Sequence, residues 1–173
     1  MKRHPGLQKF SREHHAALVL AKRAQRLGGG AAEAAVRFAA EAAQACSTEL
    51  EPHFSAEEDG LLPALAAAGE TALVNRTLAD HEALRALACR LAAGDVAGLR
   101  RFGELLAAHV RFEERELYPR AESTLPAEAL ADIDRAARTR PSDGPAALSD
   151  GDPPCAPARS FPPPKLMQKG VSQ

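Results

Sequence analysis

The sequence contains few of the residues that favour β-strands. Among its 173 residues there are six valines, one isoleucine, one tyrosine and no tryptophan. Because strands favour β-branched and aromatic side chains, this composition argues against a β or mixed α/β fold. The 38 alanines and 21 leucines favour helices instead. We therefore predict an all-α protein, and its length suits one domain with a possible tail.

Long apolar segments and an excess of one charge are also missing. The longest uninterrupted apolar run is 16–21, whereas a membrane-spanning helix needs about 20 residues. The 22 basic and 23 acidic residues give a formal net charge of −1, which argues against a nucleic-acid-binding domain. We therefore expect no membrane span and no nucleic-acid partner.

Export signals are lacking as well. The N-terminal segment MKRHPGLQKF is basic but has no apolar segment of the kind found in secretory signal peptides. The three cysteines, at positions 46, 89 and 155, show neither metal-site nor disulfide spacing. An odd cysteine count without an export signal is typical of a reducing compartment. We therefore expect a cytoplasmic protein.

Turn-forming residues divide the chain into four long helical stretches. Gly28-Gly29-Gly30 ends the first, Asp59-Gly60 ends the second, and Gly94-Asp95 separates the third from the fourth. Pro52 predicts a kink in the second stretch, and Pro119 ends or bends the fourth. Short connections between long helices imply an up-down-up-down four-helix bundle. The expected stretches are 10–27, 31–58, 70–93 and 96–118, with short extra helices at 61–68 and 126–138.

The C-terminal segment differs from the rest of the chain. Eight of the 13 prolines lie in residues 139–173, among glycines, serines and aspartates. Such a segment cannot bury enough apolar surface to offset the entropy lost on ordering. We therefore predict a bundle in residues 1–138 and a Pro-rich disordered tail in residues 139–173.

Two of the long helices contain the same motif. Residues 53–63 are HFSAEEDGLLP and residues 109–119 are HVRFEERELYP. In both, a histidine precedes a Glu-Glu pair by four residues, and a proline ends the motif. Residues four apart on a helix lie on the same face. The two pairs that this spacing predicts are His53 with Glu57 and His109 with Glu113.

The first glutamate of each motif has no basic residue one helical turn away on its own helix. Glu114, in contrast, follows Arg111 by three residues and is explained by an ordinary surface ion pair. A buried, unpaired carboxylate costs several kcal/mol, and a bound metal ion with imidazole co-ligands removes that cost. One H-x-x-x-E pair alone is better explained by a solvated surface, but the recurrence of the whole motif favours a metal site.

The other two long helices each supply a histidine. On a helical wheel His14 lies within about 60° of Leu18, whereas His15 shares a face with Lys22. We therefore predict that His14 points inward and that His15 lies at the rim. His81 also lies on an apolar face, although an isolated core histidine is more often structural. The six candidate metal ligands are His14, His53, Glu57, His81, His109 and Glu113.

Four nearby residues are weaker candidates for supporting roles. Glu49, four residues before His53, is a candidate acceptor for the imidazole N–H. Tyr118 and Phe54 are expected to line the pocket. Cys46 is expected to be a small buried thiol.

This arrangement resembles the hemerythrin-like, or HHE cation-binding, domain family. The resemblance rests on one histidine in the first and third helices and H-x-x-x-E in the second and fourth, and it covers about residues 7–122. It implies two iron ions, with manganese or zinc less expected. It also implies terminal ligands at His14, His53, His81 and His109, and bridging carboxylates at Glu57 and Glu113.

The sequence departs from the oxygen-carrying hemerythrins in two ways. Those proteins have a fifth histidine one turn from the third-helix ligand, where this chain has Thr77 and Arg85. Their second bridging residue is an aspartate five residues after the last histidine, whereas Glu113 follows by four. Both departures resemble the four-histidine, two-glutamate subgroup, which includes iron–sulfur repair proteins. The ligand count then leaves about one open position on each metal.

We therefore expect a protein that binds or senses a small oxidant, namely O₂, NO or peroxide. Iron storage or donation, including iron–sulfur cluster repair, is one alternative, and enzymatic decomposition of peroxide is another. A structural bundle without metal is the remaining alternative. Binding or sensing is preferred over catalysis, and a sensor of this kind would signal through an unidentified protein partner.

Overall fold

The computed structural model describes residues 3–30 and 32–139. All regular elements of these residues are helical, so the predicted all-α fold is confirmed. The tail predicted for residues 139–173 lies outside the described residues, except for Thr139, which ends the last helix.

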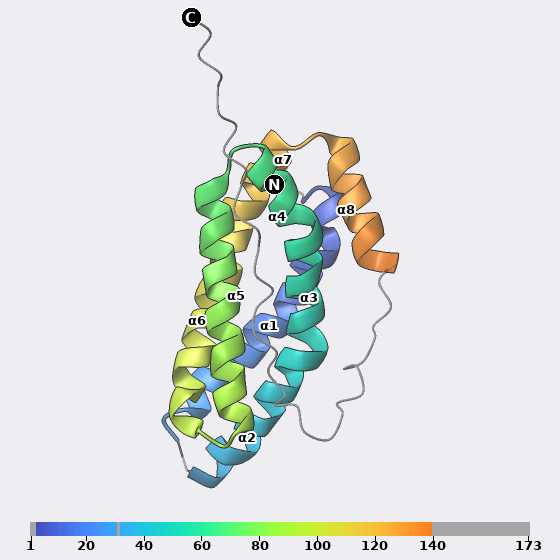
Figure 1. The fold of residues 1–173 in the computed structure, drawn as a ribbon. Helices are drawn as coiled ribbons and strands as arrows, with labels where there is room; N and C mark the ends of the chain where they lie inside the picture. The colour runs from blue at the N-terminus through green and yellow to red at the C-terminus, as the bar shows by residue number, and fades with distance from the viewer. Residues whose placement is uncertain (1–2, 31, 140–173) are drawn as a thin grey trace, which may run out of the picture.

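Four antiparallel helical rods form the bundle (Figure 1). The first rod is one helix, the second and fourth are interrupted helices, and the third is again one helix. The first rod is α1 (Gln8–Leu27), and the third is α5 (Thr71–Ala92). The second rod consists of α2 (Ala32–Ala45), α3 (Glu51–Ala56) and α4 (Leu62–Ala67). The fourth consists of α6 (Leu99–Phe112) and α7 (Tyr118–Thr124).

A shorter helix, α8 (Ala127–Thr139), lies outside the four rods. It packs against the N-terminal turn Pro5–Leu7 at the end of the bundle where α4 and α7 lie (Figure 1). Turns with left-handed glycines separate the later rods, since Gly69 and Gly94 have φ angles of 91° and 86°. The stop predicted at Gly94-Asp95 is therefore confirmed.

The prolines inside the rods do not break them. Each of these prolines comes two residues after the end of a five-residue π-turn. In a π-turn, a backbone N–H group donates to the carbonyl oxygen five residues back instead of four. A proline has no N–H and its ring displaces the carbonyl four residues earlier, and the wider turn accommodates both effects. The three π-turns are Cys46–Leu50 before Pro52, Glu57–Leu61 before Pro63, and Glu113–Leu117 before Pro119.

Two sequence predictions are corrected by this geometry. The helix end predicted at Asp59-Gly60 is wrong, because these residues lie inside a π-turn and the rod continues into α4. The fourth rod likewise passes Pro119 and continues to Thr124. At Pro52, where a kink was predicted, the hydrogen bonding changes locally to a π-turn, with helical backbone on both sides.

The core consists of two apolar clusters. One contains residues such as Ala21, Phe38 and Phe102, and the other contains Leu7, Leu61 and Ile133. On every rod, the residues between the two clusters include buried histidine or glutamate side chains. A polar layer therefore crosses the middle of the bundle, between two apolar ends.

The first and fourth rods approach each other closely. A Cβ atom on Gly103 of α6 would lie 2.5 Å from the carbonyl oxygen of Ala21 on α1, so only glycine allows this approach. Cys46 is a buried free thiol, as predicted. Within the described ranges, no helix has both the length and the apolar character that a membrane span requires.

Candidate metal centre

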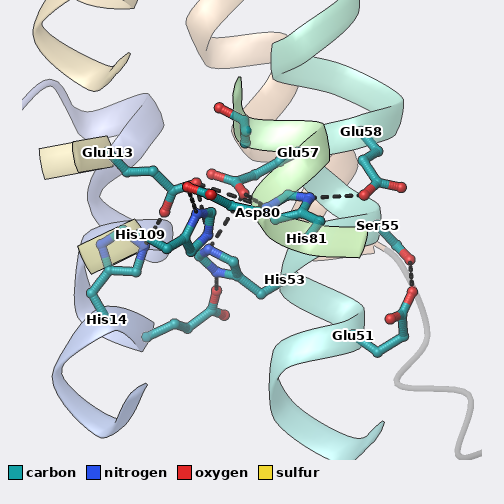
Figure 2. Close-up of polar contacts among 12 residues, drawn as sticks. His14, Glu51, His53, Ser55, Glu57, Glu58, Asp80, His81, His109 and Glu113 are labelled. Atoms are coloured by element: carbon teal, nitrogen blue, oxygen red, sulfur yellow. Dashed lines mark hydrogen bonds and ion pairs between the residues drawn. The ribbon is translucent and has the colours of Figure 1, made fainter. Parts of the chain in front are cut away.

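The polar layer brings together all six candidate ligands from the four rods (Figure 2). The six side chains are almost completely removed from solvent, with relative exposures between 0 and 4%. They comprise His14 from α1, His53 and Glu57 from the second rod, His81 from α5, and His109 and Glu113 from the fourth rod.

The repeated motif places each of its histidines beside its first glutamate. Nε2 of His53 lies 3.6 Å from Oε2 of Glu57, and Nε2 of His109 lies 3.1 Å from Oε1 of Glu113. This proximity follows from the i,i+4 spacing, because each histidine lies one helical turn before its glutamate.

Each of these glutamates also faces histidines from other rods. Oε2 of Glu113 lies 3.0 Å from Nε2 of His14, while its Oε1 faces His109. Oε2 of Glu57 lies 3.4 Å from Nε2 of His81. The donor atoms form two groups that could each hold a metal ion, and Glu113 belongs to both. The groups are His14, His53 and Glu113, and Glu57, His81, His109 and Glu113.

Several of the inward-facing atoms have no hydrogen-bond partner. They include Nε2 of His53, His81 and His109 and both carboxylate oxygens of Glu113. Burying such atoms without a partner is costly, and native proteins rarely do so. Imidazole nitrogen and carboxylate oxygen together are ligands for iron, manganese or zinc. The residues therefore fit bound cations.

A second layer of carboxylates surrounds the histidines. Each imidazole directs Nε2 inward and Nδ1 toward a carboxylate from another rod. A carboxylate at Nδ1 holds the N–H there and leaves Nε2 free to bind a metal. The hydrogen-bonded pairs are His14 with Glu114 at 2.8 Å, His53 with Glu13 at 2.9 Å, and His81 with Glu58 at 2.8 Å. Asp80 faces Nδ1 of His109 from 3.6 Å, beyond hydrogen-bond distance.

These contacts form a closed cycle around the bundle. The carboxylate at each histidine comes from the preceding rod in chain order. The fourth rod closes the cycle, because its carboxylate faces the histidine of the first rod. Every one of these acids is adjacent in sequence to a candidate ligand of its own rod. The four adjacent pairs are Glu13-His14, Glu57-Glu58, Asp80-His81 and Glu113-Glu114.

Two predictions about these acids are wrong. Glu49 is exposed, and Glu13 takes the position at His53 that we predicted for Glu49. Glu114 is not explained by a surface pair with Arg111, because its carboxylate contacts Nδ1 of His14 and accepts a hydrogen bond from Ser11. The sequence signal that was missed is the acid next to each ligand, including the second glutamate of both motifs.

Further contacts hold His81 in place. Arg85, one turn later, donates one hydrogen bond to Glu58 and two to Glu51. The ring of Phe54 stacks on the imidazole, with centroids 4.0 Å apart and an angle of 19° between the planes. The orientation of His81 is therefore fixed by both a carboxylate and an aromatic ring.

Tyr118 is the other residue whose role the sequence did not fully predict. It lies five residues after Glu113, which on an α-helix is about 140° away from it. The intervening π-turn absorbs one residue and reduces this angle to about 40°. The completely buried hydroxyl donates to Oε1 of Glu57 at 2.7 Å and lies 3.2 Å from Nε2 of His14. We had expected Tyr118 only to line the pocket.

The charges of the centre favour protons or cations at the histidines. Burial lowers the pKa of His14, but its contacts with Glu113 and Glu114 outweigh burial and raise that pKa to about 9. Burial is likewise outweighed by glutamate contacts at His81, whose pKa rises to about 10. Burial would raise the pKa of Glu113, but the charges and hydrogen bonds of His109, His14 and His81 hold it well below its usual value.

The predicted orientation of the first-rod histidines is confirmed. His14 is buried in the centre, whereas His15 is exposed. A cavity of about 850 Å³ is lined by His14, His53 and His109 and also by more peripheral residues such as Lys9 and Glu49. The cavity therefore offers a route for small molecules to the centre.

Comparison with known protein families agrees with this geometry. A family model described as the hemerythrin HHE cation binding domain matches residues 6–121. Searches of characterised proteins and of solved structures gave no match. The matched segment contains all six candidate ligands and all four surrounding carboxylates. The chain therefore belongs to the hemerythrin HHE cation-binding domain family.

Proposed function

We propose that this protein holds two iron ions in the polar layer and uses them to bind or sense a small oxidant, namely O₂, NO or peroxide. The six ligands would be the residues predicted from the sequence: His14, His53, Glu57, His81, His109 and Glu113. Manganese and zinc are less favoured occupants.

The observation that supports this proposal most directly is the set of unpaired inward-facing atoms. Three imidazole nitrogens and three carboxylate oxygens are buried there without hydrogen-bond partners. The candidate ligands form two donor groups, and Glu113 belongs to both. A carboxylate shared in this way could bind one cation with each of its oxygens. When bound, the iron would supply open coordination positions and redox chemistry.

The chain's own residues prepare the centre for this role. Three outer carboxylates hydrogen-bond the Nδ1 atoms of His14, His53 and His81, which turns each Nε2 inward before a cation arrives, and Asp80 lies 3.6 Å from Nδ1 of His109. The apolar clusters on both sides exclude bulk water from the layer. Access is then restricted to small molecules that enter along the cavity.

The same outer carboxylates favour retention of the metal over its donation. The imidazoles of His14, His53 and His81 are each held at two sites, by the backbone and by a carboxylate from another rod, so release requires several contacts to change together. We therefore favour a binding or sensing protein over an iron donor. We further propose that it works in the cytoplasm and that a sensed ligand is communicated to a separate protein.

The test is a titration of the anaerobic, iron-loaded protein with NO, followed by absorption spectroscopy. We expect saturable and reversible binding at the metal, with iron still bound after the gas is removed. The control is His53→Ala, which removes one inward nitrogen. Loss of iron to a weak chelator without NO binding would favour donation, and rapid turnover of peroxide would favour an enzyme.

A further inference from the structure

The two copies of the repeated motif differ at one position next to the metal centre. The residue before the terminal proline is Tyr118 in the second copy and Leu62 in the first. Both are completely buried. Only the second copy therefore supplies a hydroxyl group at this position. The two halves of the centre are chemically different although the motif is repeated.

The hydroxyl of Tyr118 reaches the half of the centre that contains His14. It lies 3.2 Å from Nε2 of His14 and donates to Oε1 of Glu57 at 2.7 Å. The hydroxyl thus touches both donor groups, since Glu57 belongs to one and His14 to the other, but the imidazole that it contacts is that of His14, in the group with His53 and Glu113. The other donor group contains His81, which stacks on the apolar ring of Phe54.

The surroundings of Tyr118 fix its ring. The ring stacks on the imidazole of His14, with centroids 5.4 Å apart and an angle of 2° between the planes. The guanidinium carbon of Arg3 lies over the same ring, 5.3 Å from the ring centroid. The hydroxyl is therefore presented at a defined position with little freedom to turn away.

We propose that the Tyr118 hydroxyl donates a hydrogen bond to a small anion that binds to the metal held by His14 and His53. This inference rests on the proposed di-iron function and deepens it. A carboxylate oxygen that binds a cation is a weaker acceptor for the phenol, so iron binding by Glu57 frees the O–H for another partner. The two metal positions then differ, and a small ligand with an acceptor atom binds preferentially at the one beside Tyr118.

The test compares azide binding by the iron-loaded, oxidised protein with that of Tyr118→Phe. The variant keeps the ring and its stacking but removes the donor. Losing a hydrogen bond to a charged group weakens binding by roughly tenfold or more. We therefore expect unchanged iron content and an azide dissociation constant raised by about that factor. The matched control is Ser123→Ala, which removes an exposed hydroxyl that bonds to the backbone carbonyl of Arg120 and should leave azide affinity unchanged.

The unaltered protein provides a second measurement. The chain has one tyrosine and no tryptophan, so its near-UV tyrosine band reports on Tyr118 alone. Azide should shift this band in the iron-loaded protein. An unshifted band would overturn the proposal, as would equal azide affinity in Tyr118→Phe.

Two other outcomes would also overturn the proposal, and they identify what replaces it. Loss of iron from Tyr118→Phe would mean that the tyrosine positions Glu57. A visible absorption band of the azide-free oxidised protein that disappears in the variant would mean that the tyrosine is a metal ligand. If the unaltered protein binds no iron, the proposed function itself fails, which metal analysis shows before azide is added.

Discussion

The outer carboxylates can be tested at His81, where the chain offers a matched pair of variants. Glu58 accepts from Arg85 at 2.8 Å and contacts Nδ1 of His81 at the same distance. Glu51 also accepts from Arg85, at 2.7 and 2.8 Å, and is not an outer partner of a candidate ligand. The substitutions Glu58→Gln and Glu51→Gln therefore both weaken the pairing of Arg85, but only the first changes the partner of His81.

The expected magnitude follows from the burial of this contact. Both partners are shielded, since the side chains of His81 and Glu58 are 0% and 14% exposed. Removing an outer partner of a ligating histidine lowers metal affinity by roughly 10- to 100-fold, which corresponds to about 1.4–2.7 kcal/mol. For Glu58→Gln we expect a loss in this range, because the amide keeps the shape of the side chain but lacks its charge.

The assay is competition for Fe²⁺ against a chromogenic chelator under anaerobic conditions. Glu51→Gln should change iron affinity by less than about threefold, because this half-buried carboxylate contacts Arg85 and is not a hydrogen-bond partner of a candidate ligand. Equal losses in the two variants would refute the reasoning, since the effect would then come from Arg85. No loss in Glu58→Gln would show that the carboxylate does not orient His81.

Three further predictions follow from the same geometry. His14→Ala should lower the iron content of the purified protein, while His15→Ala should leave it unchanged. The pKa values of His14 and His81 are about 9 and about 10, above the ordinary value of 6.5. The protonated histidines therefore stabilise the metal-free protein fully below about pH 6.5, and this stabilisation is lost as the pH rises through 9 and 10. Melting temperatures in EDTA should therefore fall over this range, and a flat profile would contradict the ion pairing. Gly103→Ala places a methyl group 2.5 Å from the carbonyl oxygen of Ala21, and urea unfolding should show a destabilisation of about 1–3 kcal/mol.

Local spacing made much of the centre predictable. The i,i+4 relation between His53 and Glu57 places both on one face whatever the rest of the fold does. The helical wheel separated His14 from His15 because the apolar residues of α1 mark its buried face. Composition and turn residues were sufficient for the all-α class and for the bundle.

The features that were missed depend on contacts between rods or on unusual backbone geometry. The partnership of Glu114 with His14 joins residues 100 positions apart, and its local alternative, Arg111, is one turn away on the same helix. The π-turns were missed because Pro52 and Pro119 were interpreted only as points where a helix kinks, bends or ends. Their recurrence ahead of Pro52, Pro63 and Pro119 explains how Tyr118 comes to face the centre.

The central claim is most directly tested by measuring the metal content of protein purified without added metal. We expect about two iron ions per chain, as the two donor groups require. The same measurement on Glu57→Ala should show that iron is lost, while Glu49→Ala, which alters an exposed glutamate, should retain both ions. Unaltered protein that contains no metal and has the same melting temperature with and without chelator would contradict the account.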